Sequence, residues 1–450
     1  MTDNIDKLQQ TDSHLALSPK SFFVQPGGKL NGTIRVPGDK SISHRSIMLG
    51  ALADGVTEVS GFLEGDDALA TLNAFRAMGV QIDGPDQGRV TIHGVGIDGL
   101  QPPENDLDVG NSGTSMRLLS GLLAGQSFVV TMTGDSSLSM RPMRRVSDPL
   151  NSMGAKISTQ DDGTPPLHIS PSTVLKGMHY DMPMASAQVK SALLLAGLYA
   201  EGETSVTEPA PTRDHTERML GGFAYPVARN GATASVQGGG RLTACNIDVP
   251  ADISSATFFM VGAAIATDSD VTLTHVGINP TRIGVINILR LMGANIDIKN
   301  EREVGGEPVA DLRIRYAPLH GIAIPEDQVP LAIDEFPALF IAAACASGET
   351  RLTGAAELRV KESDRIQVMA DGLQALGIDA RPTDDGMVIQ AGQLHGGHVE
   401  SHGDHRIAMS FAMAGLRADG EISIGNCANV ATSFPGFVEL AGEAGLRIRT

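Results

Sequence analysis

Six short segments of the chain carry polar or charged residues, and together they suit anion binding. They read GDKSISHR, GNSGTSMR, MASAQVKS, ADISSA, IDEFP and GDHRIAMS, and they start at Gly38, Gly110, Met184, Ala251, Ile333 and Gly403. Each leads into a stretch of small and apolar residues that predicts a buried helix. Because helix N-termini carry free N–H groups and partial positive charge, several of them around one cleft would bind a polyanion.

Helix capping is a simpler explanation for some of these polar residues. Ser, Asp and Asn favour the start of a helix, where a cap contributes about 1 kcal/mol. We therefore interpret Asp252 and Ser254 as caps. Capping does not explain the cationic or bulky members, which are Lys40, Arg45, Gln188, His405 and Arg406. Basic side chains hold phosphate and carboxylate groups, so these residues predict a small ligand that carries several negative charges.

Two further segments concentrate charge. The cations of SMRPMRRVSD are Arg141, Arg144 and Arg145. The segment LRVKESDR places Lys361, Glu362 and Arg365 within about one helical turn. A ladder of surface ion pairs explains the second segment without any ligand, and by itself we would favour that explanation. The segment TRDHTER, around Arg213, is open to both interpretations.

The chain as a whole is acidic, so an anion site has to be a local cluster. Its 450 residues include 34 Lys and Arg against 52 Asp and Glu, a formal charge of −18. This balance argues against nucleic acid or a membrane surface as partner, because both need a positive surface. No apolar run approaches the roughly 20 residues that span a bilayer. The polar N-terminus has no apolar signal core, so we expect a cytoplasmic protein.

Cysteines and histidines give little sign of a metal site. Three cysteines, at positions 245, 345 and 427, are odd in number and widely spaced, and we expect buried free thiols. The spacing of His395, His398, His402 and His405 superficially fits a metal ion, but the glycines between them favour a turn. We expect no metal ion at these residues.

A phrase that recurs along the chain predicts an internal repeat. A small-residue helix, a Gly or polar break and a β-branched strand follow one another in ALADGVTEV, LLAGQSFVV, LYAEGETSV, AIATDSDVTL, ACASGETRL and GLRADGEISI. A second helix–Gly–strand phrase interleaves with it, with Gly79, Gly154, Gly293, Gly377 and Gly445 at the expected helix ends and a degraded copy near Gly222. The chain therefore predicts six units of about 70–80 residues, each with strands and two helices.

The repeats group into two domains of three units. VPGDKSIS, from Val36, echoes VPADISSA, from Val249, and each would open one half. We expect one domain over residues 37–249 and a second over 26–36 plus 250–450, with hinges near 36–40 and 249–252. Residues 1–25 are expected to form a flexible tail. Cations on both faces would repel each other until anionic ligands draw the domains together.

Helices that are apolar on every face determine the expected fold class. SALLLAGLYA and ALFIAAACA have no polar stripe, so each would be buried on all sides. We therefore expect an α/β protein of two inside-out domains, each of three repeated βαβαββ units with buried helices and outer sheets. No Gly-rich dinucleotide or nucleotide loop follows a strand.

Ten motifs, in order, resemble the EPSP synthase family (3-phosphoshikimate 1-carboxyvinyltransferase). They are GKLNGTIRVPGDKSISHRS, GNSGTSMRLL, RPMRRV, MPMASAQVKSALLLAG, TRDHTE, NPTR, IDEFP, ELRVKESDR, GDHRIAMSF and ATSFPGF, from about Gly28 to Phe437. The resemblance implies the inside-out fold. It also implies that the 5-hydroxyl of shikimate 3-phosphate adds to phosphoenolpyruvate, and that phosphate then leaves a tetrahedral intermediate, without metal or cofactor.

The resemblance also implies roles for individual residues. Shikimate 3-phosphate would be held by Lys40, Ser41, Arg45, Ser186, Ala187, Gln188, Arg213, Asp334 and Lys361. Phosphoenolpyruvate would be held by Lys40, Gly113, Arg141, Gln188, Arg365 and Arg406, with Asn111, Thr114 and His405 in support. Asp334 would take the hydroxyl proton, Glu362 would protonate the enol carbon, and Lys40 would assist catalysis. Glu335 is a weaker candidate for the base.

Variant motifs place the chain closer to the glyphosate-tolerant branch of the family. MASAQVKS and ATSFP have Ala187 and Thr432 where the other branch carries Ser and Lys, so any contact carried over at those positions is open. Gly113 stands where tolerant relatives carry Ala, whose methyl group crowds the inhibitor. We therefore predict that glyphosate competes with phosphoenolpyruvate. We expect a monomer.

Two other functions compete with this interpretation. UDP-N-acetylglucosamine enolpyruvyl transferase shares the fold and the donor, but its reactive loop carries a Cys and residues 131–147 have none. A non-catalytic anion-binding relative would lack the Asp334 and Glu362 pair, and both are present.

Overall fold

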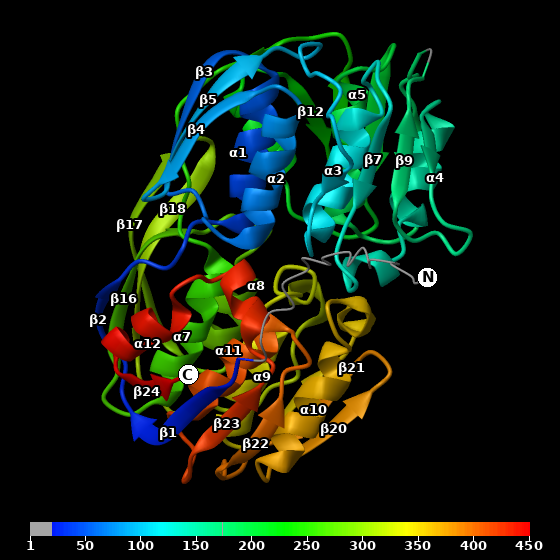
Figure 1. Ribbon diagram of the computed structural model, residues 1–450. Coiled ribbons are helices and arrows are strands. Elements are labelled where there is room, and N and C mark those ends of the chain that lie inside the picture. Colours follow the sequence, from blue (N-terminus) through cyan, green and yellow to red (C-terminus); the bar gives the residue numbers. More distant parts are fainter. Residues whose placement is uncertain (1–19, 173) are drawn as a thin grey trace, which may run out of the picture.

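The computed structural model describes residues 20–172 and 174–450, and they form two lobes (Figure 1). Buried apolar side chains form one cluster from Ile42 to Val249 in the upper lobe of the figure. A second cluster fills the lower lobe and combines residues 22–36 with residues 251–446. Each lobe therefore has its own core, and the N-terminal strands belong to the core of the C-terminal half.

The upper lobe contains three units of helices and strands. The first unit is α1 (Lys40–Leu52), β3 (Ala53–Ser60), α2 (Asp66–Ala77), β4 (Gln81–Asp86) and β5 (Arg89–Val95), joined by β14 (Leu242–Thr243) and β15 (Ile247–Asp248). The second is β6 (Leu107–Asp108), α3 (Gly113–Leu123), β7 (Val130–Thr133), α4 (Arg144–Ser152), β8 (Lys156–Ser158) and β9 (Leu167–Ser170). The third is β10 (His179–Asp181), α5 (Ala187–Gly197), β11 (Glu203–Thr207), α6 (His215–Gly222), β12 (Val227–Asn230) and β13 (Thr233–Gln237).

The lower lobe repeats the arrangement. Its first unit is β2 (Asn31–Ile34), α7 (Ile253–Ile265), β16 (Asp270–Gly277), α8 (Gly284–Leu291), β17 (Asn295–Val304) and β18 (Glu307–Arg315). The second is α9 (Phe336–Cys345), β19 (Glu349–Leu352), α10 (Arg365–Ala375), β20 (Asp379–Thr383) and β21 (Gly386–Gln390). The third is β22 (Gly397–Glu400), α11 (His405–Ala414), β23 (Ile422–Gly425), α12 (Phe437–Ala444) and β24 (Leu446–Arg449), completed by β1 (Phe22–Gly28).

Each unit contributes one sheet, and the described residues form six sheets. Five of them are mixed, and the sheet β19-β21-β20 is antiparallel. In the order β6-β7-β9-β8, for example, β6 and β7 run parallel and the other neighbours run antiparallel. β1 pairs with β23 and β24, and β2 pairs with β16, so two different sheets of the lower lobe include an N-terminal strand. The predicted α/β architecture of repeated units is confirmed.

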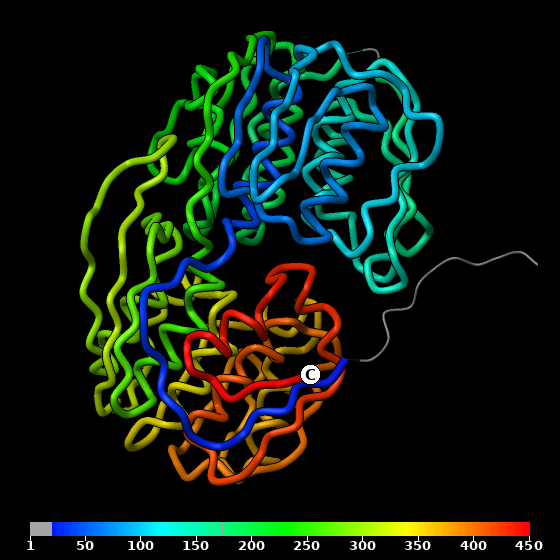
Figure 2. The backbone as a smooth tube through the Cα atoms, turned by 60° about the vertical axis from the view of Figure 1, so that its left-hand side comes forward, coloured from blue at the N-terminus to red at the C-terminus, as the bar shows by residue number. Residues whose placement is uncertain are grey.

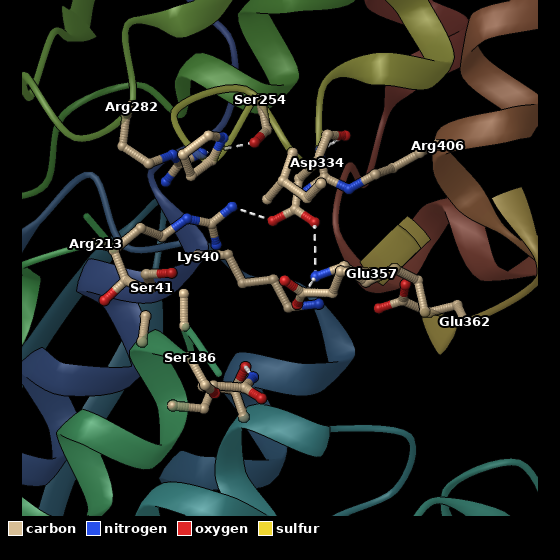
Figure 3. A pocket seen from close by; sticks show the side chains of 18 of the residues that line it. Lys40, Ser41, Ser186, Arg213, Ser254, Arg282, Asp334, Glu357, Glu362 and Arg406 are labelled. Carbon is tan, nitrogen blue, oxygen red and sulfur yellow. Dashed lines mark hydrogen bonds and ion pairs between the residues drawn. The ribbon is translucent and has the colours of Figure 1, made fainter. Parts of the chain in front are cut away.

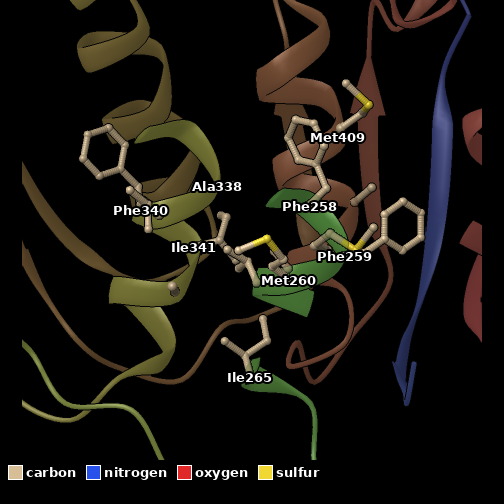
Figure 4. Close-up of a cluster of buried hydrophobic side chains, with 14 of the residues drawn as sticks. Phe258, Phe259, Met260, Ile265, Ala338, Phe340, Ile341 and Met409 are labelled. Atoms are coloured by element: carbon tan, nitrogen blue, oxygen red, sulfur yellow. The ribbon is translucent and has the colours of Figure 1, made fainter. Parts of the chain in front are cut away.

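The first helix of each unit lies inside its lobe. Every residue of α7 is buried, and the helices α7, α9 and α11 pack against one another in the lower core, where Phe258, Phe340 and Met409 lie (Figure 4). A helix that is apolar all round can only be stable where every face is covered. Helices therefore fill the lobes and sheets form their outer walls, as the apolar repeats predict.

Two details correct the expectations from sequence. The predicted flexible tail over residues 1–25 is wrong for residues 22–25, which belong to β1 in a sheet; residues 1–19 of that prediction lie outside the described part of the chain. The cysteines are free thiols, but only Cys427 is fully buried, and Cys245 and Cys345 are partly exposed. Burial raises the pKa of Cys427 to about 12. In the described residues, no helix is long and apolar enough to cross a membrane.

The two segments that pass between the lobes run side by side, and the tube in Figure 2 shows the blue N-terminal one rising from the lower lobe. Gly38 and Ala251 form an antiparallel bridge. The N–H of Asp39 donates to Pro250 O at 2.8 Å, and the N–H of Asp252 donates to Pro37 O at 2.9 Å. We call residues 36–40 and 249–252 the crossovers. Their mutual hydrogen bonds join the lobes at one edge.

Candidate active site

A cavity of about 470 Å³ has walls from both lobes (Figure 3). Cavities of this size accept small metabolites. Among the described residues, eight Lys and Arg side chains and five Asp and Glu side chains line it, although the chain carries a formal charge of −18. The cations are Lys40, Arg117, Arg141, Arg145, Arg213, Arg282, Lys361 and Arg406. The structure therefore gathers a local basic cluster in an acidic protein.

The inner helices deliver these residues because all of them start at the cavity. The first or second turns of α1, α3, α5, α7 and α11 contribute to the wall, and the turn before α9 contributes Asp334. Five of these helices are capped by the side chain of the residue just before the helix, which accepts a hydrogen bond from an N–H group of the first turn. The capping residues are Asp39, Ser112, Ser186, Asp252 and Asp404. Capping by these neighbours leaves the side chains of Lys40, Gln188 and Arg406 free to face the cavity.

Three arginines of the upper lobe form the least compensated part of the wall. Arg117, Arg141 and Arg145 all line the cavity, and none has a carboxylate within 4.0 Å in the described chain. Arg117 donates to the amide oxygen of Gln188 at 2.7 Å, and Arg141 donates to Asn111 Oδ1 at 2.7 Å. Burial, with the neighbouring charges of Arg145 and Arg141, lowers the pKa of Arg117 to about 10. Such crowding of positive charge favours a bound anion.

Asp334 faces these arginines from the lower lobe. Its carboxylate pairs with Arg213 of the upper lobe, and it lies 3.5 Å from Lys361 Nζ and 3.3 Å from an Arg365 nitrogen. Burial alone would raise the pKa of Asp334, but Lys361, Arg213, Arg406 and Arg365 together hold it well below its usual value. The carboxylate is therefore ionised and poorly basic while these cations surround it.

Glu362 lies near Asp334 and is connected to it through one buried arginine. Arg365 donates to Glu362 Oε2 at 2.5 Å, to Asp334 Oδ1 at 3.3 Å and to Asp404 Oδ2 at 2.8 Å. Burial would raise the pKa of Glu362, but Arg365 above all, with His405 and Arg141, lowers it strongly. The two predicted catalytic carboxylates thus share one guanidinium that fixes their relative positions.

Lys40 connects the lobes at the cavity. Its ammonium group pairs with Asp67 of the upper lobe and donates to Ser433 Oγ of the lower lobe at 3.0 Å. Close by, the Gln188 amide donates to Thr114 Oγ1 at 3.1 Å. The predicted ligand residues that line the cavity are Lys40, Ser41, Thr114, Arg141, Ser186, Ala187, Gln188, Arg213, Asp334, Lys361, Glu362, His405 and Arg406.

Four predicted site residues do not line the cavity. Arg45 is 5 % exposed and donates to Thr216 Oγ1 and Ser191 Oγ behind α1. Asn111 binds Arg141, and Arg365 lies beneath Asp334 and Glu362. Gly113 contributes space rather than a contact, because a Cβ atom there would lie 3.1 Å from Arg117 and 3.3 Å from Arg141.

Two predictions about charged segments need correction. Lys361 and Glu362 do not share a helical turn with Arg365, because a short 3-10 helix ends at Val360 and α10 begins at Arg365. Ser254 does not act as a side-chain cap: its hydroxyl donates to Glu335 and accepts from Arg282 at 2.6 Å. Glu335, the weaker candidate for the base, is 3 % exposed, points to these partners and does not line the cavity.

Several cavity residues had no assigned role in the sequence interpretation. Arg117 and Arg282 belong to the quoted motifs GNSGTSMR and NPTR, Ser433 belongs to ATSFP, and Glu357 precedes Lys361 by one helical turn. Because Arg117 and Arg282 belong to quoted motifs, the motifs could have indicated that these arginines are part of the site. Their proximity to the cavity results from tertiary packing, which cannot be predicted from spacing along the chain.

The histidine series shows no arrangement for a metal ion. His395 contacts Asp419 at 2.7 Å and His398 contacts Ser423 Oγ at 3.0 Å, while His405 lines the cavity. Within the described part of the chain, no three His, Cys, Asp or Glu side chains are placed to hold a metal ion together.

The family model described as EPSP synthase (3-phosphoshikimate 1-carboxyvinyltransferase) matches residues 24–440. The chain belongs to the EPSP synthase family. A 3-phosphoshikimate 1-carboxyvinyltransferase from Methylococcus capsulatus is 71% identical over 95% of this chain and 98% of the relative. Another, from Alkalilimnicola ehrlichii, is 69% identical over 95% of this chain and 96% of the relative. As a member of the EPSP synthase family, the protein is an enzyme.

Solved structures agree with this family assignment. The EPSP synthase of Acinetobacter baumannii superposes with a TM-score of 0.88 at 63% identity, over 95% of this chain and 99% of that one. The enolpyruvyl transferase NikO from Streptomyces tendae superposes with a TM-score of 0.76 at 18% identity, over 96% of this chain and 98% of that one. The second likeness shows that the fold of two α/β lobes extends beyond close relatives.

Proposed function

We propose that the cavity transfers the enolpyruvyl group of phosphoenolpyruvate to the 5-hydroxyl of shikimate 3-phosphate and releases phosphate. The reaction follows from the EPSP synthase family, and the roles of individual residues, which the resemblance implies, are part of the proposal. The observation that carries it is a group of three arginines, Arg117, Arg141 and Arg145, that has no carboxylate partner in the described chain. The same cavity is lined by Asp334 and Glu362. Two bound anions would supply the negative charge that compensates these arginines.

Shikimate 3-phosphate fits the part of the cavity around α1, α5 and Arg213. Ser41, Ser186 and Gln188 offer donors for a phosphate near helix N-termini, where N–H groups and the helix dipole favour anions. Asp334 lies beside Arg213 in this region. We assign Lys40, Ser41, Ser186, Ala187, Gln188, Arg213, Asp334 and Lys361 to this ligand, with Arg45 supporting Ser41 through a bond to its carbonyl at 3.0 Å.

Phosphoenolpyruvate fits between the arginine group and Arg406. Guanidinium groups match carboxylate and phosphate oxygens in pairs, and phosphoenolpyruvate has both groups. Lys40, Gln188, Arg141 and Arg406 line this part, and Gly113 leaves the guanidinium groups of Arg117 and Arg141 in place. Arg365 acts on this ligand through Glu362 rather than by direct contact.

Ligand binding supplies the basicity that the two carboxylates lack in the free protein. Burial would raise the pKa of Asp334 and of Glu362, but the surrounding cations have the larger effect and lower both pKa values. When the ligands' phosphate and carboxylate groups neutralise those cations, both pKa values rise. Asp334 can then take the 5-hydroxyl proton, and a protonated Glu362 can donate to the methylene carbon of phosphoenolpyruvate. The 5-oxygen attacks the central carbon, which carries oxocarbenium-like charge, and the new C–O bond gives a tetrahedral intermediate. The methyl group then returns a proton to Glu362 as the bond to the phosphate oxygen breaks, which re-forms the double bond and releases phosphate.

The two lobes are separate domains in this proposal, over residues 37–249 and over 22–36 plus 250–450. Separate apolar cores support this division, and the paired crossovers support hinges near 36–40 and 249–252. Cations on both walls repel each other without ligands, so bound anions favour the closed arrangement. The protein acts as a cytoplasmic monomer in this proposal.

The motif variants also assign the chain to the glyphosate-tolerant branch in this proposal. We nevertheless propose that glyphosate can enter the cavity. Ala187 and Thr432 are the variant positions, and Gly113 leaves the room that a methyl group would take. Glyphosate carries a phosphonate and a carboxylate, the same anionic groups that the arginine wall accommodates, so it competes with phosphoenolpyruvate.

The test offers both known classes of acceptor to the purified protein. Phosphoenolpyruvate is supplied with shikimate 3-phosphate or with UDP-N-acetylglucosamine, and released phosphate is measured, with and without a strong chelator. We expect phosphate release with shikimate 3-phosphate alone, unaffected by the chelator. Release only with UDP-N-acetylglucosamine, or with neither acceptor, would contradict the proposal.

A further inference from the structure

Arg282 occupies the point where the two crossovers meet. It lies in the turn before α8, is 3 % exposed, and belongs to the lower lobe. One terminal nitrogen lies 3.4 Å from Asp39 Oδ2 in the first crossover, and the other lies 3.3 Å from Asp252 Oδ1 in the second. A single guanidinium therefore bridges the carboxylates of both segments that join the lobes.

The same guanidinium reaches the segment that carries Asp334. It donates to Ser254 Oγ at 2.6 Å and lies 3.6 Å from Glu335 Oε1, while Ser254 donates to Glu335. Glu335 is the neighbour of Asp334 in the chain and the N-terminal residue before α9. Figure 3 shows Arg282, Ser254 and Asp334 on one side of the cavity.

Arg406 completes the link on the other side of this segment. It donates to the backbone carbonyl of Asp334 at 3.0 Å and lies 3.7 Å from Glu335 Oε1. The backbone around Asp334 is thus held from one side by Arg406, a predicted ligand residue, and from the other by Arg282 through Glu335. Movement of the crossovers relative to Arg282 would shift Glu335 and, with it, Asp334.

Electrostatics make Arg282 difficult to replace. It meets three carboxylates, and Asp39, Asp252 and Glu335 are each less than 9 % exposed. Removal of one partner from a buried charge cluster leaves the remaining charges unpaired. Lysine would keep the charge, but its single ammonium group cannot span three carboxylates as a planar guanidinium does.

We propose that Arg282 is a positioning residue that connects the geometry of the interlobe crossovers to the pose of Asp334. Arg282 lines the cavity, but the role proposed here is exerted through Glu335 and Ser254 and needs no substrate contact. The inference rests on the proposed transfer reaction, because its effect is on the carboxylate that takes the hydroxyl proton. It predicts loss of turnover without equal loss of shikimate 3-phosphate binding.

The test compares Arg282→Lys with Arg290→Lys, a matched control at an exposed arginine of α8 whose guanidinium group donates, within residues 20–172 and 174–450, to Ile296 O alone. We expect kcat of Arg282→Lys to fall about 10- to 100-fold, as small displacements of a catalytic group do. The dissociation constant of shikimate 3-phosphate, measured by calorimetry, should stay within about threefold. Arg290→Lys should retain wild-type kcat. If wild type itself releases no phosphate, the proposed function fails, independently of Arg282.

A second variant separates positioning from a general structural role. Glu335→Gln removes the intermediate carboxylate, so it should lower kcat in the same way, and adding it to Arg282→Lys should lower kcat by less than about twofold more. If Arg282→Lys does not fold, Glu335→Gln alone carries the test through its kcat and its shikimate 3-phosphate affinity. Wild-type kcat in either folded variant, fully additive losses, or parallel losses of kcat and binding would overturn the inference.

Discussion

The carboxylates that the reaction requires are paired with cations in the free protein. Asp334 contacts Arg213, Lys361 and Arg365, and Glu362 contacts Arg365. A carboxylate that is paired with cations is a weak base until a bound anion neutralises those cations. Substrate binding and the activation of these groups are therefore one event in this account, and the site stays inactive when empty.

Neutral replacements of the two carboxylates test their roles. Asp334→Asn and Glu362→Gln keep the size of each side chain but remove the proton acceptor or donor, so kcat should fall about 10²- to 10⁴-fold. Binding of shikimate 3-phosphate, measured by calorimetry, should remain. Asp379→Asn, an exposed position on β20, is the control and should match wild type. A near-normal rate in either variant would remove that residue from its role.

Gly113 predicts the response to glyphosate. A methyl group at this position would lie 3.1 Å from a nitrogen of Arg117 and 3.3 Å from a nitrogen of Arg141, so both guanidinium groups have to shift. Gly113→Ala should raise the KM for phosphoenolpyruvate by about threefold and the inhibition constant of glyphosate by more than about tenfold, because glyphosate is longer between its two anionic groups and tolerates less crowding. Steady-state inhibition kinetics measure both.

The control for this variant is Gly221→Ala, where a Cβ atom would have no neighbour within 4 Å. It should leave both constants unchanged. Wild-type turnover that persists at high glyphosate and low phosphoenolpyruvate would show that the inhibitor does not enter this cavity.

Individual site residues were predictable where type and motif agreed. Lys40, Gln188 and Arg406 are cations or amides at helix starts, where capping cannot explain them, and they line the cavity. Arg282 and Glu335 could not be assigned from sequence, because their partners come from segments up to about 240 residues away, such as Asp39. Their burial is a property of the assembled crossovers.

At the scale of elements, the active site is a set of helix N-termini. The inner helices start at one cavity, and caps such as Ser112 satisfy part of their first turns. Ser112 is fully buried, accepts from the N–H of Ser115 at 3.1 Å and accepts from its hydroxyl at 2.7 Å. That hydroxyl contacts Thr71 Oγ1 at 2.6 Å. The start of α3 is therefore held by a buried polar network.

Ser112→Ala tests how much this cap contributes. Loss of a buried cap leaves an N–H and a hydroxyl without their acceptor, so the free energy of unfolding should fall by about 1–2 kcal/mol. Urea unfolding measures the change. Ser152→Ala, an exposed serine of α4, is the control and should change the free energy of unfolding by less than about 0.5 kcal/mol. Equal effects in the two variants would contradict the importance of the cap.

The repeated elements were predictable because apolar helices and glycine helix ends recur along the chain. All five predicted helix-end glycines adopt positive φ, for example Gly79 at +85°. The degraded sixth copy places its left-handed residue at Ala224 rather than at Gly222. The separation of the N-terminal strand into β1 and β2, in two different sheets, was not predictable, because the pairing partners are remote in sequence. β1 pairs with β23 and β24 near the C-terminus, and β2 pairs with β16 in the middle of the chain.

At the scale of the molecule, buried neutral histidines should make the fold sensitive to acid. Burial above all, with Lys40 nearby, lowers the pKa of His44 from 6.5 to about 3. Burial also lowers the pKa of His405 from 6.5 to about 4, although Asp404 acts in the opposite direction. Between these values and 6.5 the unfolded chain binds more protons than the folded one. The folded state therefore loses stability as the pH falls through this range.

His44→Gln should reduce that dependence. Each histidine that stays neutral only when folded contributes a slope of about 1.4 kcal/mol per pH unit. Below about pH 6 and above about pH 4, the slope of unfolding free energy against pH should decrease by up to that amount in the variant. The exposed His168→Gln should keep the wild-type slope. Identical slopes in His44→Gln and wild type would contradict the assignment.

The central claim is that cations from both lobes bind two small anions in one cavity. A crystal structure of the protein with shikimate 3-phosphate and glyphosate tests it most directly. We predict both ligands between the lobes, in contact with Lys40 and Arg141 from one side and with Lys361 and Arg406 from the other. Ligands bound to one lobe alone, or outside this cavity, would contradict the account.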